Sequence, residues 1–565
     1  MTAPGLTKSG VKGSDVYTED GVGDGRVALF QQLVRGCDVA YIHTAVQKAF
    51  GAKDVREDVL RDYFVMAFQT RDVRGGKGER DVFYDMLFSL IAQRPALIQA
   101  LVDLIPEYGC WADCWKLWTR VDASVAAAHS VSVQAAILSL VKRVWTIDVA
   151  AGAAEGKGAK SVSLLWKWLP REKSKHHALA VEFADAFFAE IENADDRLRA
   201  YRKVCSAFNA RLKTCEVAMC GGAWASIEPG KVPGRLLNKC RSAFLNEIRA
   251  RKGKPTPRRA GLRYPDSADR MACKEHFTTH MAAAVKGEAT VKGADTVYPH
   301  EIVDKFMYSA QIEKAEEELL QAQWNAIRDA TAAQGGLRGV VPMCDFSGSM
   351  GGIPMQVSMA LGILLSEINH PAFKDGMIGF DSTPNWIQFK PGMSLKEKVS
   401  YAQNYAQGTS TDFQAACDLI LRRLVEYKVP AEEAPKDMIV FTDMGFDAAC
   451  GSGYGYSHVK KTKSWETHVE MIKNSFASAG YVAPRIVLWN LRAAYKDFHA
   501  KADETGVVLL SGWSPAILKA IQKAGVEVKT PYQGMRELLD DARYDAVRAA
   551  FHGVEAGVEA GAESA

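Results

Sequence analysis

The stretch RGVVPMCDFSGSM, residues 338–350, joins an apolar run to one carboxylate and two hydroxyl side chains. The apolar run has the length and the β-branched content of a buried strand. Asp345, Ser347 and Ser349 then stand at every second position, and a helical pattern follows over 357–368. Open α/β sheets bind their ligands at the carboxyl ends of their strands. We therefore expect these three side chains to meet at a ligand-binding edge of a sheet.

Strand and helix patterns alternate from this stretch to the end of the chain. Besides the opening stretch, the expected strands are 377–382, 385–390, 437–444, 485–491, 506–511 and 526–530. The expected helices lie near 357–368, 395–407, 412–427 and 465–479, from 515 onward, and at 533–551. Such alternation implies a mostly parallel, doubly wound α/β sheet of the Rossmann type. We assign it to a C-terminal domain at 334–552.

The N-terminal half has a different pattern. Over 27–333 the apolar residues recur at helical spacing, as in VLRDYFVMAFQT (59–70) and ALAVEFADAFFAEI (178–191). This pattern predicts an α-helical repeat region of stacked antiparallel pairs, as in HEAT-like arrays. Residues 1–26 and 553–565 are rich in small, polar and charged residues and are predicted to be flexible tails.

The composition excludes some classes of protein and leaves others open. Among 565 residues there are 70 Lys and Arg against 67 Asp and Glu, a net charge of +3, so any affinity for nucleic acid must arise from local clusters. Eleven cysteines without a paired CxxC spacing favour reduced thiols. The N-terminus lacks the pattern of a signal peptide, and no eighteen consecutive residues are apolar. We expect a cytoplasmic protein that does not span a membrane.

The oxygen side chains of the opening stretch suit a hard divalent cation. One carboxylate and two hydroxyls favour Mg²⁺ or Mn²⁺ over zinc. Further oxygens could come from Thr411, at the head of a predicted helix, and from Asp443, at the end of the strand 437–444. Mg²⁺ prefers six oxygens, so a position would remain for a ligand carboxylate or phosphate. In the alternative interpretation, Ser349 only caps the following helix.

These residues also carry a family resemblance. CDFSGSM (344–350), the Thr of STDF (410–413) and the Asp of VFTDMGF (440–446) resemble the five-point metal-ion-dependent adhesion site of von Willebrand factor A domains. The resemblance implies that the metal is held by Asp345, Ser347, Ser349, Thr411 and, directly or through water, Asp443. Thr409 competes with Thr411, but Thr411 stands at the family's usual distance from the small Ala416.

The chain departs from this family after the fourth strand, where it carries the apparent insertion CGSGYGYSHVKKTKSWETH (450–468). The insertion either shapes partner specificity or is a surface loop without a function. Enzymatic chemistry is not expected at the site. A phosphatase aspartate needs a second acid two residues on, and that position is Ser347. A metal-dependent hydrolase would need a general base, which the sequence does not supply here.

Two basic clusters are candidates for contacts with nucleic acid. TRDVRGGKGERDVFY (70–84) lacks both the spacing and the strand of a Walker loop. Its basic residues either contact phosphate or form a solvated turn. The span 231–263 has eleven Lys or Arg against the single acid Glu247, which indicates either a nucleic-acid surface or a disordered basic loop. Chosen from charge alone, the candidates are Arg71, Arg74, Lys77, Arg80, Arg249, Arg251, Lys252, Lys254, Arg258, Arg259 and Arg263.

The helical half carries a second resemblance. AFQTRDVRGGKGERDVFY (67–84), IPEYGCWADCWKLW (105–118), KWLPREKS (167–174) and VYPHEIV (297–303) resemble the uncharacterised domain-of-unknown-function family 2828. That family joins a helical region to a von Willebrand A-like domain, and it resembles in turn the Ro autoantigen, whose TROVE domain is a ring of helical repeats that binds non-coding RNA.

The sequence thus leads to two hypotheses about function. The first is a non-enzymatic RNA-binding or ribonucleoprotein scaffold: a TROVE-like helical region joined to a Mg²⁺-binding von Willebrand A domain, with small structured or single-stranded RNA as its partner. The second is a protein-interaction module in which a partner's Asp or Glu completes the metal shell, without RNA.

Overall fold

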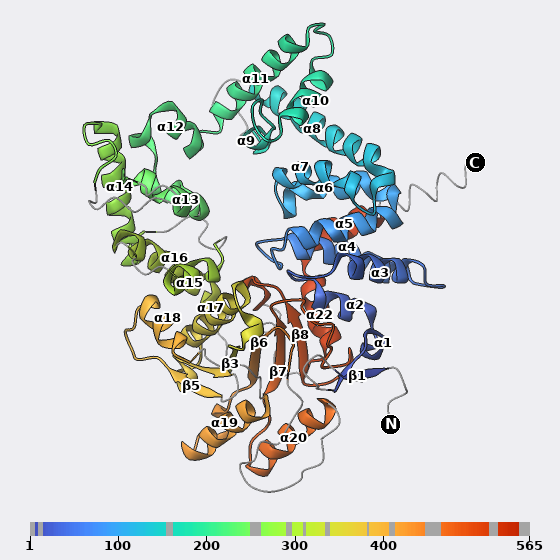
Figure 1. Ribbon diagram of the computed structural model, residues 1–565, viewed down its shortest axis with the longest axis vertical. Helices are drawn as coiled ribbons and strands as arrows, with labels where there is room; N and C mark the ends of the chain where they lie inside the picture. Colours follow the sequence, from blue (N-terminus) through green and yellow to red (C-terminus); the bar gives the residue numbers. More distant parts are fainter. Residues whose placement is uncertain are drawn as a thin grey trace. The chain divides into compact units, whose positions relative to one another are not determined.

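The protein is described by a computed structural model that covers residues 6–9, 15–153, 162–248, 261–289, 297–308, 312, 314–333, 339–380, 384–405, 413–446, 465–518 and 529–552. The chain folds as two compact units, each described separately below. The first, called here the sheet unit, comprises Met1–Met86 and Met281–Asp545. The second, the helical unit, comprises Leu87–His280 and Ala546–Ala565. The expected combination of a helical region with a C-terminal α/β region is therefore present (Figure 1).

The sheet unit is built on a six-stranded sheet in the order β5-β4-β3-β6-β7-β8. Neighbouring strands are parallel except for β5, which pairs antiparallel with β4 at one edge. From β3 the chain first adds strands on one side and then, from β6, on the other, as in a doubly wound sheet. The strands are β3 (Val340–Asp345), β4 (Gly376–Phe380), β5 (Asn385–Gln388), β6 (Asp437–Thr442), β7 (Arg485–Asn490) and β8 (Val507–Ser511).

Each of these six strands was predicted from the sequence. A seventh, at 526–530, lies mostly outside the described residues, and its last residue, Thr530, is the N-cap of a helix. The helix expected at 533–551 is divided into α22 (Pro531–Leu539), the short turn Ala542–Tyr544 and helical residues 545–552. The side chain of Asp541 caps that turn by accepting a hydrogen bond from the backbone N–H of Arg543.

Helices cover the sheet. The central one, α17, packs against β3, β4 and β6, and it is buried along most of its length. Gly362 permits this close approach, because a Cβ there would lie 2.3 Å from Cys344 Sγ on β3. The other helices of this unit are α1 (Glu19–Val22), α2 (Gly25–Gln32), α3 (Val39–Phe50), α4 (Glu57–Arg71), α15 (Pro299–Tyr308), α16 (Lys314–Ala333), α18 (Leu395–Gln403), α19 (Phe413–Glu426) and α20 (Trp465–Ser478), while α17 runs Ile353–Ile368.

In the helical unit, α6 packs on α7 and α8, and α10 packs on α11. Stacked aromatic rings connect further helices. The ring centres of Trp145 on α8 and Phe187 on α10 lie 4.4 Å apart, and those of Trp166 on α9 and Phe208 on α11 lie 4.2 Å apart. The helices are α5 (Asp81–Gln93), α6 (Ile98–Tyr108), α7 (Trp111–Arg120), α8 (Ser130–Ala153), α9 (Leu165–Trp168), α10 (His177–Phe187), α11 (Ala194–Arg211), α12 (Cys215–Gly221), α13 (Gly234–Phe244) and α14 (Ala268–Val285), with α5 and α14 crossing the unit boundary.

Within the described ranges, no single helix has the length and apolar character of a membrane span. Two bent pairs, Asp81–Gln93 with Pro95–Tyr108 and Trp111–Ala123 with Ala127–Ala151, reach those limits only when their members are taken together.

The start of the chain differs from the expected flexible tail at 1–26. Strand β1 (Thr7–Ser9) pairs antiparallel with β2 (Asp15–Tyr17), and α1 and α2 follow. Val16 and Tyr17 are buried, and the backbone N–H of Tyr17 donates to the carbonyl of Phe498 at 2.8 Å. Small and polar composition suggested a loose segment, but these two apolar side chains anchor it. The second predicted tail, 553–565, lies outside the described residues.

The division of the chain also differs from the expected boundary at 333/334, because the first 86 residues belong to the sheet unit. Ion pairs between buried aspartates and partly buried arginines explain this grouping. Asp62 on α4 accepts hydrogen bonds from Arg26 at 2.8 Å and from Arg536 on α22 at 2.5 Å. The carboxylate of Asp72 accepts from Arg543, from Tyr544 and from the backbone N–H groups of two residues in its own loop. The contacts of Arg536 with Asp62 and of Arg543 with Asp72 join positions more than 470 residues apart in the sequence.

We predict that Asp72→Asn lowers the free energy of unfolding by about 1–3 kcal/mol, since it removes the charge of a buried carboxylate that is bonded to a partly exposed arginine. Urea denaturation measures this change. Asp58→Asn is the matched control: Asp58 also pairs with an arginine, but on the surface, so no measurable change is expected. Equal stabilities of the two variants would contradict the role assigned to Asp72.

Candidate metal centre

Two aspartates lie at the carboxyl ends of neighbouring parallel strands. Asp345 is the last residue of β3, and Asp443 directly follows β6. The register pairs Cys344 with Phe441, so Asp345 lies beside Thr442, the residue that precedes Asp443. Because the chain leaves β3 and β6 toward opposite edges of the sheet, this is the switch point at which doubly wound sheets bind ligands. Both aspartates are fully buried.

Asp345 is held by two local hydrogen bonds. Its Oδ1 accepts from the backbone N–H of Ser347 at 2.9 Å, and its Oδ2 accepts from Thr442 Oγ1 at 2.8 Å. Burial raises the pKa of Asp345 from its ordinary value to about 6, and the negative charge of Asp443 adds to this effect. The hydrogen bonds from Ser347 and Thr442 act in the opposite direction. The hydrogen bonds therefore do not fully offset the cost of burying the ionised carboxylate. A bound cation would stabilise the ionised form.

Asp443 provides the clearest sign of a missing partner. Its Oδ1 accepts a hydrogen bond from the backbone N–H of Gly445 at 3.1 Å. Its Oδ2 is buried and has no hydrogen-bond partner within the described part of the chain. A buried carboxylate oxygen without a partner costs free energy, and such atoms are rare in folded proteins.

The turn after β6 holds Asp443 in place. Met444 has φ +70, a left-handed conformation that is unfavourable for a residue with a side chain. Its backbone N–H donates to Thr442 Oγ1 at 3.1 Å, and its carbonyl lies 2.7 Å from His499 Nε2. Strained residues of this kind persist where the surroundings fix them, and they are frequent at binding sites.

The two serines complete the cluster. Ser347 Oγ lies 3.1 Å from Ser349 Oγ; Ser347 is buried, whereas Ser349 is partly exposed and marks the open side. The capping alternative for Ser349 is wrong, because the N-cap of α17 is Gly352 and no side chain caps that helix. The site therefore brings together four of the five predicted metal residues: Asp345, Ser347, Ser349 and Asp443. The fifth, Thr411, and its competitor Thr409 lie outside the described residues, as does most of the insertion at 450–468.

The oxygen set fits a divalent cation of the Mg²⁺ or Mn²⁺ type. Two carboxylates and two hydroxyls are hard ligands, and Asp443 Oδ2 is the buried orphan atom that a cation would satisfy. Among the described residues, no three His, Cys, Asp or Glu side chains are grouped so that they could together hold a metal ion, and the candidate site depends on hydroxyl oxygens as well.

Sequence reasoning missed two residues at the rim. Arg492, on the loop after β7, is exposed and donates from Nη1 to the carbonyl of Ser349 at 3.1 Å. The ring of Tyr495 packs over Gly445, where a Cβ would lie 2.9 Å from Tyr495 Cε2. Partial burial and the charge of Asp443 raise the pKa of Tyr495. No local pattern singles out these residues, because only the pairing of β7 with β6 brings their loop to the site.

Two of the predicted nucleic-acid residues are corrected by the structure. Arg71 is 3% exposed and Lys77 is 0% exposed, so neither can contact a phosphate backbone. Lys77 Nζ donates to the carbonyls of Phe30 and Leu33 and to Ser511 Oγ. The reason is the glycine pair: Gly76 packs so tightly that a Cβ would lie 1.8 Å from the carbonyl oxygen of Gln69, and the loop turns inward.

The other predicted nucleic-acid residues are either exposed or not described. Arg74, Arg80 and Arg263 are exposed, and the guanidinium of Arg263 lies 5.1 Å from the centre of the exposed Tyr264 ring. The remaining candidates lie outside the described residues: Arg249, Arg251, Lys252, Lys254, Arg258 and Arg259.

Two comparisons relate the chain to other proteins. Residues 340–550 match the family model described as "Domain of unknown function (DUF7788)". The chain is also 27% identical over 464 residues to "Uncharacterized protein L728" of Acanthamoeba polyphaga mimivirus, which covers 81% of this chain and 76% of that protein. The family match begins at the first residue of β3 and so includes the whole six-stranded sheet. The viral relative extends the similarity beyond it into the rest of the chain.

We predict a pH dependence of stability for the metal-free protein in the presence of a chelator. The pKa of Asp345 is about 6 when folded, against an ordinary value of 3.8, so the folded protein binds this proton more tightly than the unfolded chain. The resulting stabilisation is present below pH 3.8 and is lost as pH rises to about 6. This difference corresponds to roughly 3 kcal/mol.

Urea denaturation at several pH values between 3.5 and 7 tests this prediction, with Asp345→Asn as the comparison. The difference in unfolding free energy between the variant and the wild type should grow in favour of the variant as pH rises. Parallel curves for the two proteins would show that Asp345 titrates normally.

Proposed function

We propose that the chain is a non-enzymatic binding protein whose sheet unit contains a von Willebrand A-like domain loaded with Mg²⁺ or Mn²⁺. The strand order, with its single antiparallel edge strand β5, agrees with such a domain. The metal would be held by Asp345, Ser347, Ser349 and Asp443, with Thr411 as the predicted fifth ligand. A bound cation would supply an electrophilic coordination position for an oxygen of a ligand.

The observation that carries this proposal is the buried, unpartnered Oδ2 of Asp443 beside a second buried carboxylate. Two carboxylates at this depth repel each other, and within the described ranges neither forms an ion pair with an arginine or a lysine. A divalent cation compensates both charges at once.

The partner that suits this site best is a protein with an exposed Asp or Glu. Ser349 lies on the open side, and the exposed Arg492 stands beside it, so an incoming anionic group would meet both the cation and a guanidinium. The residue two positions after Asp345 is a serine, which cannot serve as the acid of a phosphatase. This supports binding rather than catalysis.

A second candidate function is RNA binding by the helical unit, which we propose is a HEAT- or TROVE-like scaffold. The packing of α6 on α7 and α8 and of α10 on α11 supports a repeat architecture. The observation in favour of RNA is the exposed Arg263, the last residue of the basic span, whose guanidinium lies over the exposed Tyr264 ring. Guanidinium and aromatic planes are surfaces on which single-stranded bases stack.

We predict that Mg²⁺ stabilises the wild-type protein against thermal unfolding, and that this effect disappears in Asp345→Asn and is weakened in Ser347→Ala. At a hundredfold excess over the dissociation constant, the gain should be about 2.7 kcal/mol. Differential scanning fluorimetry with and without chelator measures it. Ser358→Ala is the matched control, because Ser358 is also a buried serine but lies on α17 and not among the proposed ligands. If the control lost the Mg²⁺ effect, or the wild type never showed it, the metal centre would be refuted.

RNA binding is tested separately by titrating single-stranded RNA at 50 to 200 mM salt. Affinity should fall with salt, and Arg263→Ala should weaken it, because phosphate neutralisation releases counterions. Lys203→Ala removes a similar exposed charge from α11 and serves as control. Equal losses in both variants would indicate charge alone, and no binding at 50 mM salt would remove this candidate.

A further inference from the structure

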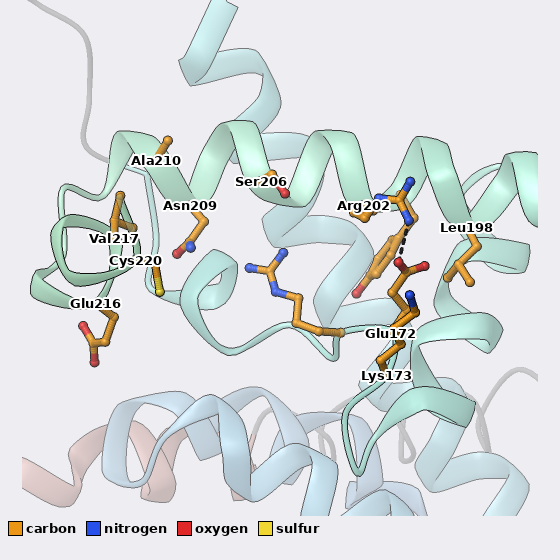
Figure 2. A pocket seen from close by; sticks show the side chains of 12 residues that line it. Glu172, Lys173, Leu198, Arg202, Ser206, Asn209, Ala210, Glu216, Val217 and Cys220 are labelled. Carbon is orange, nitrogen blue, oxygen red and sulfur yellow. Dashed lines mark hydrogen bonds and ion pairs between the residues drawn. The ribbon is translucent and has the colours of Figure 1, made fainter. Parts of the chain in front are cut away.

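The helical unit contains a cavity of about 510 Å³ that none of the predictions from sequence anticipated. It lies between α11, the segment after α9 and the short helix α12 (Figure 2). Its volume falls within the roughly 300–1,000 Å³ of small-molecule sites. The lining residues are Arg171, Glu172, Lys173, Leu198, Tyr201, Arg202, Ser206, Asn209, Ala210, Glu216, Val217 and Cys220.

The charges around this cavity leave an excess of positive groups. Glu172 forms an ion pair with Arg202 at 2.5 Å, and Figure 2 shows this pair at one end of the cavity. Glu216, at the other end, forms an ion pair with Lys167 at 2.7 Å. Within the described part of the chain, no ion pair with an acidic side chain is found for the two other cations of the wall, Arg171 and Lys173. The positive charge of the wall therefore favours an anionic ligand.

The guanidinium of Arg171 is fixed in position rather than free in solvent. Its Nη2 donates to the carbonyl of Trp166 at 2.7 Å. The neighbouring Tyr201 is buried, and its hydroxyl donates to the carbonyl of Pro170 at 3.1 Å, which ties α11 to this segment. Lys173 follows in a left-handed conformation with φ +59, which is strained for a non-glycine residue. Lys173 is exposed and lines the same cavity, so the wall carries a fixed guanidinium and an ammonium. A phosphate has enough oxygens and charge to interact with both cations.

Asn209 adds a requirement for a hydrogen-bond donor. Its Oδ1 is buried and has no hydrogen-bond partner among the described residues. In Figure 2 Asn209 points from α11 between the two ends of the cavity. The remaining wall includes the apolar side chains of Leu198, Ala210 and Val217. The complementary ligand thus has an anionic group, an N–H donor and an apolar or flat surface.

We propose that this cavity binds a nucleoside 5′-phosphate, either free or at the end of an RNA strand. The phosphate lies against Arg171 and Lys173, and an N–H group of the base donates to Asn209 Oδ1. The apolar side chains contact the faces of the base and the ribose. A bare inorganic anion would fill only a small part of the cavity and would leave Asn209 unsatisfied. This site is independent of the metal centre, because its lining residues all belong to the helical unit.

Isothermal titration calorimetry on the full chain tests the proposal with four probes. These are AMP, adenosine, an RNA hexamer with a 5′-phosphate and the same hexamer with a 5′-hydroxyl. AMP or the phosphorylated hexamer should bind, and each should bind at least about tenfold more tightly than its unphosphorylated counterpart. If AMP binds, the free nucleotide is a sufficient ligand; if only the phosphorylated hexamer binds, the source is an RNA end.

Three variants locate the site. Arg171→Gln, Lys173→Ala and Asn209→Ala should each weaken the binding of the phosphorylated probe by about tenfold. Lys175→Ala is the matched control: it removes the same charge two residues away, from an exposed position that does not line the cavity, and should leave binding within about twofold. Arg171 also bonds to Trp166, so thermal unfolding is used to check that the Arg171→Gln variant folds. If it does not fold, the Lys173→Ala and Asn209→Ala variants test the proposal.

The proposal is overturned if neither phosphorylated probe binds at millimolar concentration. It is also overturned if adenosine binds as tightly as AMP, or if Lys175→Ala weakens binding as much as Lys173→Ala does. In the last case the binding would reflect the general positive charge of the segment and not the cavity.

Discussion

Two carboxylates buried at the ends of adjacent parallel strands are the constraint on which the sheet unit depends. Asp345 and Asp443 are both fully buried, and burial together with the charge of Asp443 raises the cost of ionising Asp345. The surrounding groups only partly offset this cost: Thr442 and the backbone of Ser347 bond to Asp345, and the backbone of Gly445 bonds to Asp443. The left-handed Met444 and the paired serines are the local means by which the chain keeps these oxygens together.

Much of this arrangement could be predicted from the sequence, because it depends on local patterns. The buried strands β3 and β6 appear in the sequence as short apolar runs, and α17 appears as an apolar pattern at helical spacing. The alternation of strands and helices can therefore be predicted. Parallel strands in turn place the residues at their carboxyl ends on one edge. That reasoning brought Asp345 and Asp443 together although 97 residues separate Asp345 from its partner Thr442.

What the sequence could not reveal depends on contacts between distant segments. Charge alone predicts Lys77 as an exposed phosphate contact, but a loop with two glycines places it inside the fold, where it bonds to Ser511 on β8. The first 86 residues belong with the sheet because of ion pairs such as Asp72 with Arg543, which have no signature in either segment. Tyr495, Arg492 and the cavity beside Arg171 are likewise products of the fold, and their residue types alone are common on any surface.

The two proposed sites lie in different units and use different chemistry, so each can fail without the other. The central claim is that the oxygens at the ends of β3 and β6 hold a divalent cation. The most direct measurement is the anomalous diffraction of crystals grown with Mn²⁺. The account predicts an anomalous peak in contact with the hydroxyls of Ser347 and Ser349 and beside Asp345 and Asp443. It would be contradicted by crystals in millimolar Mn²⁺ that show no peak there and a protein donor bonded to Asp443 Oδ2.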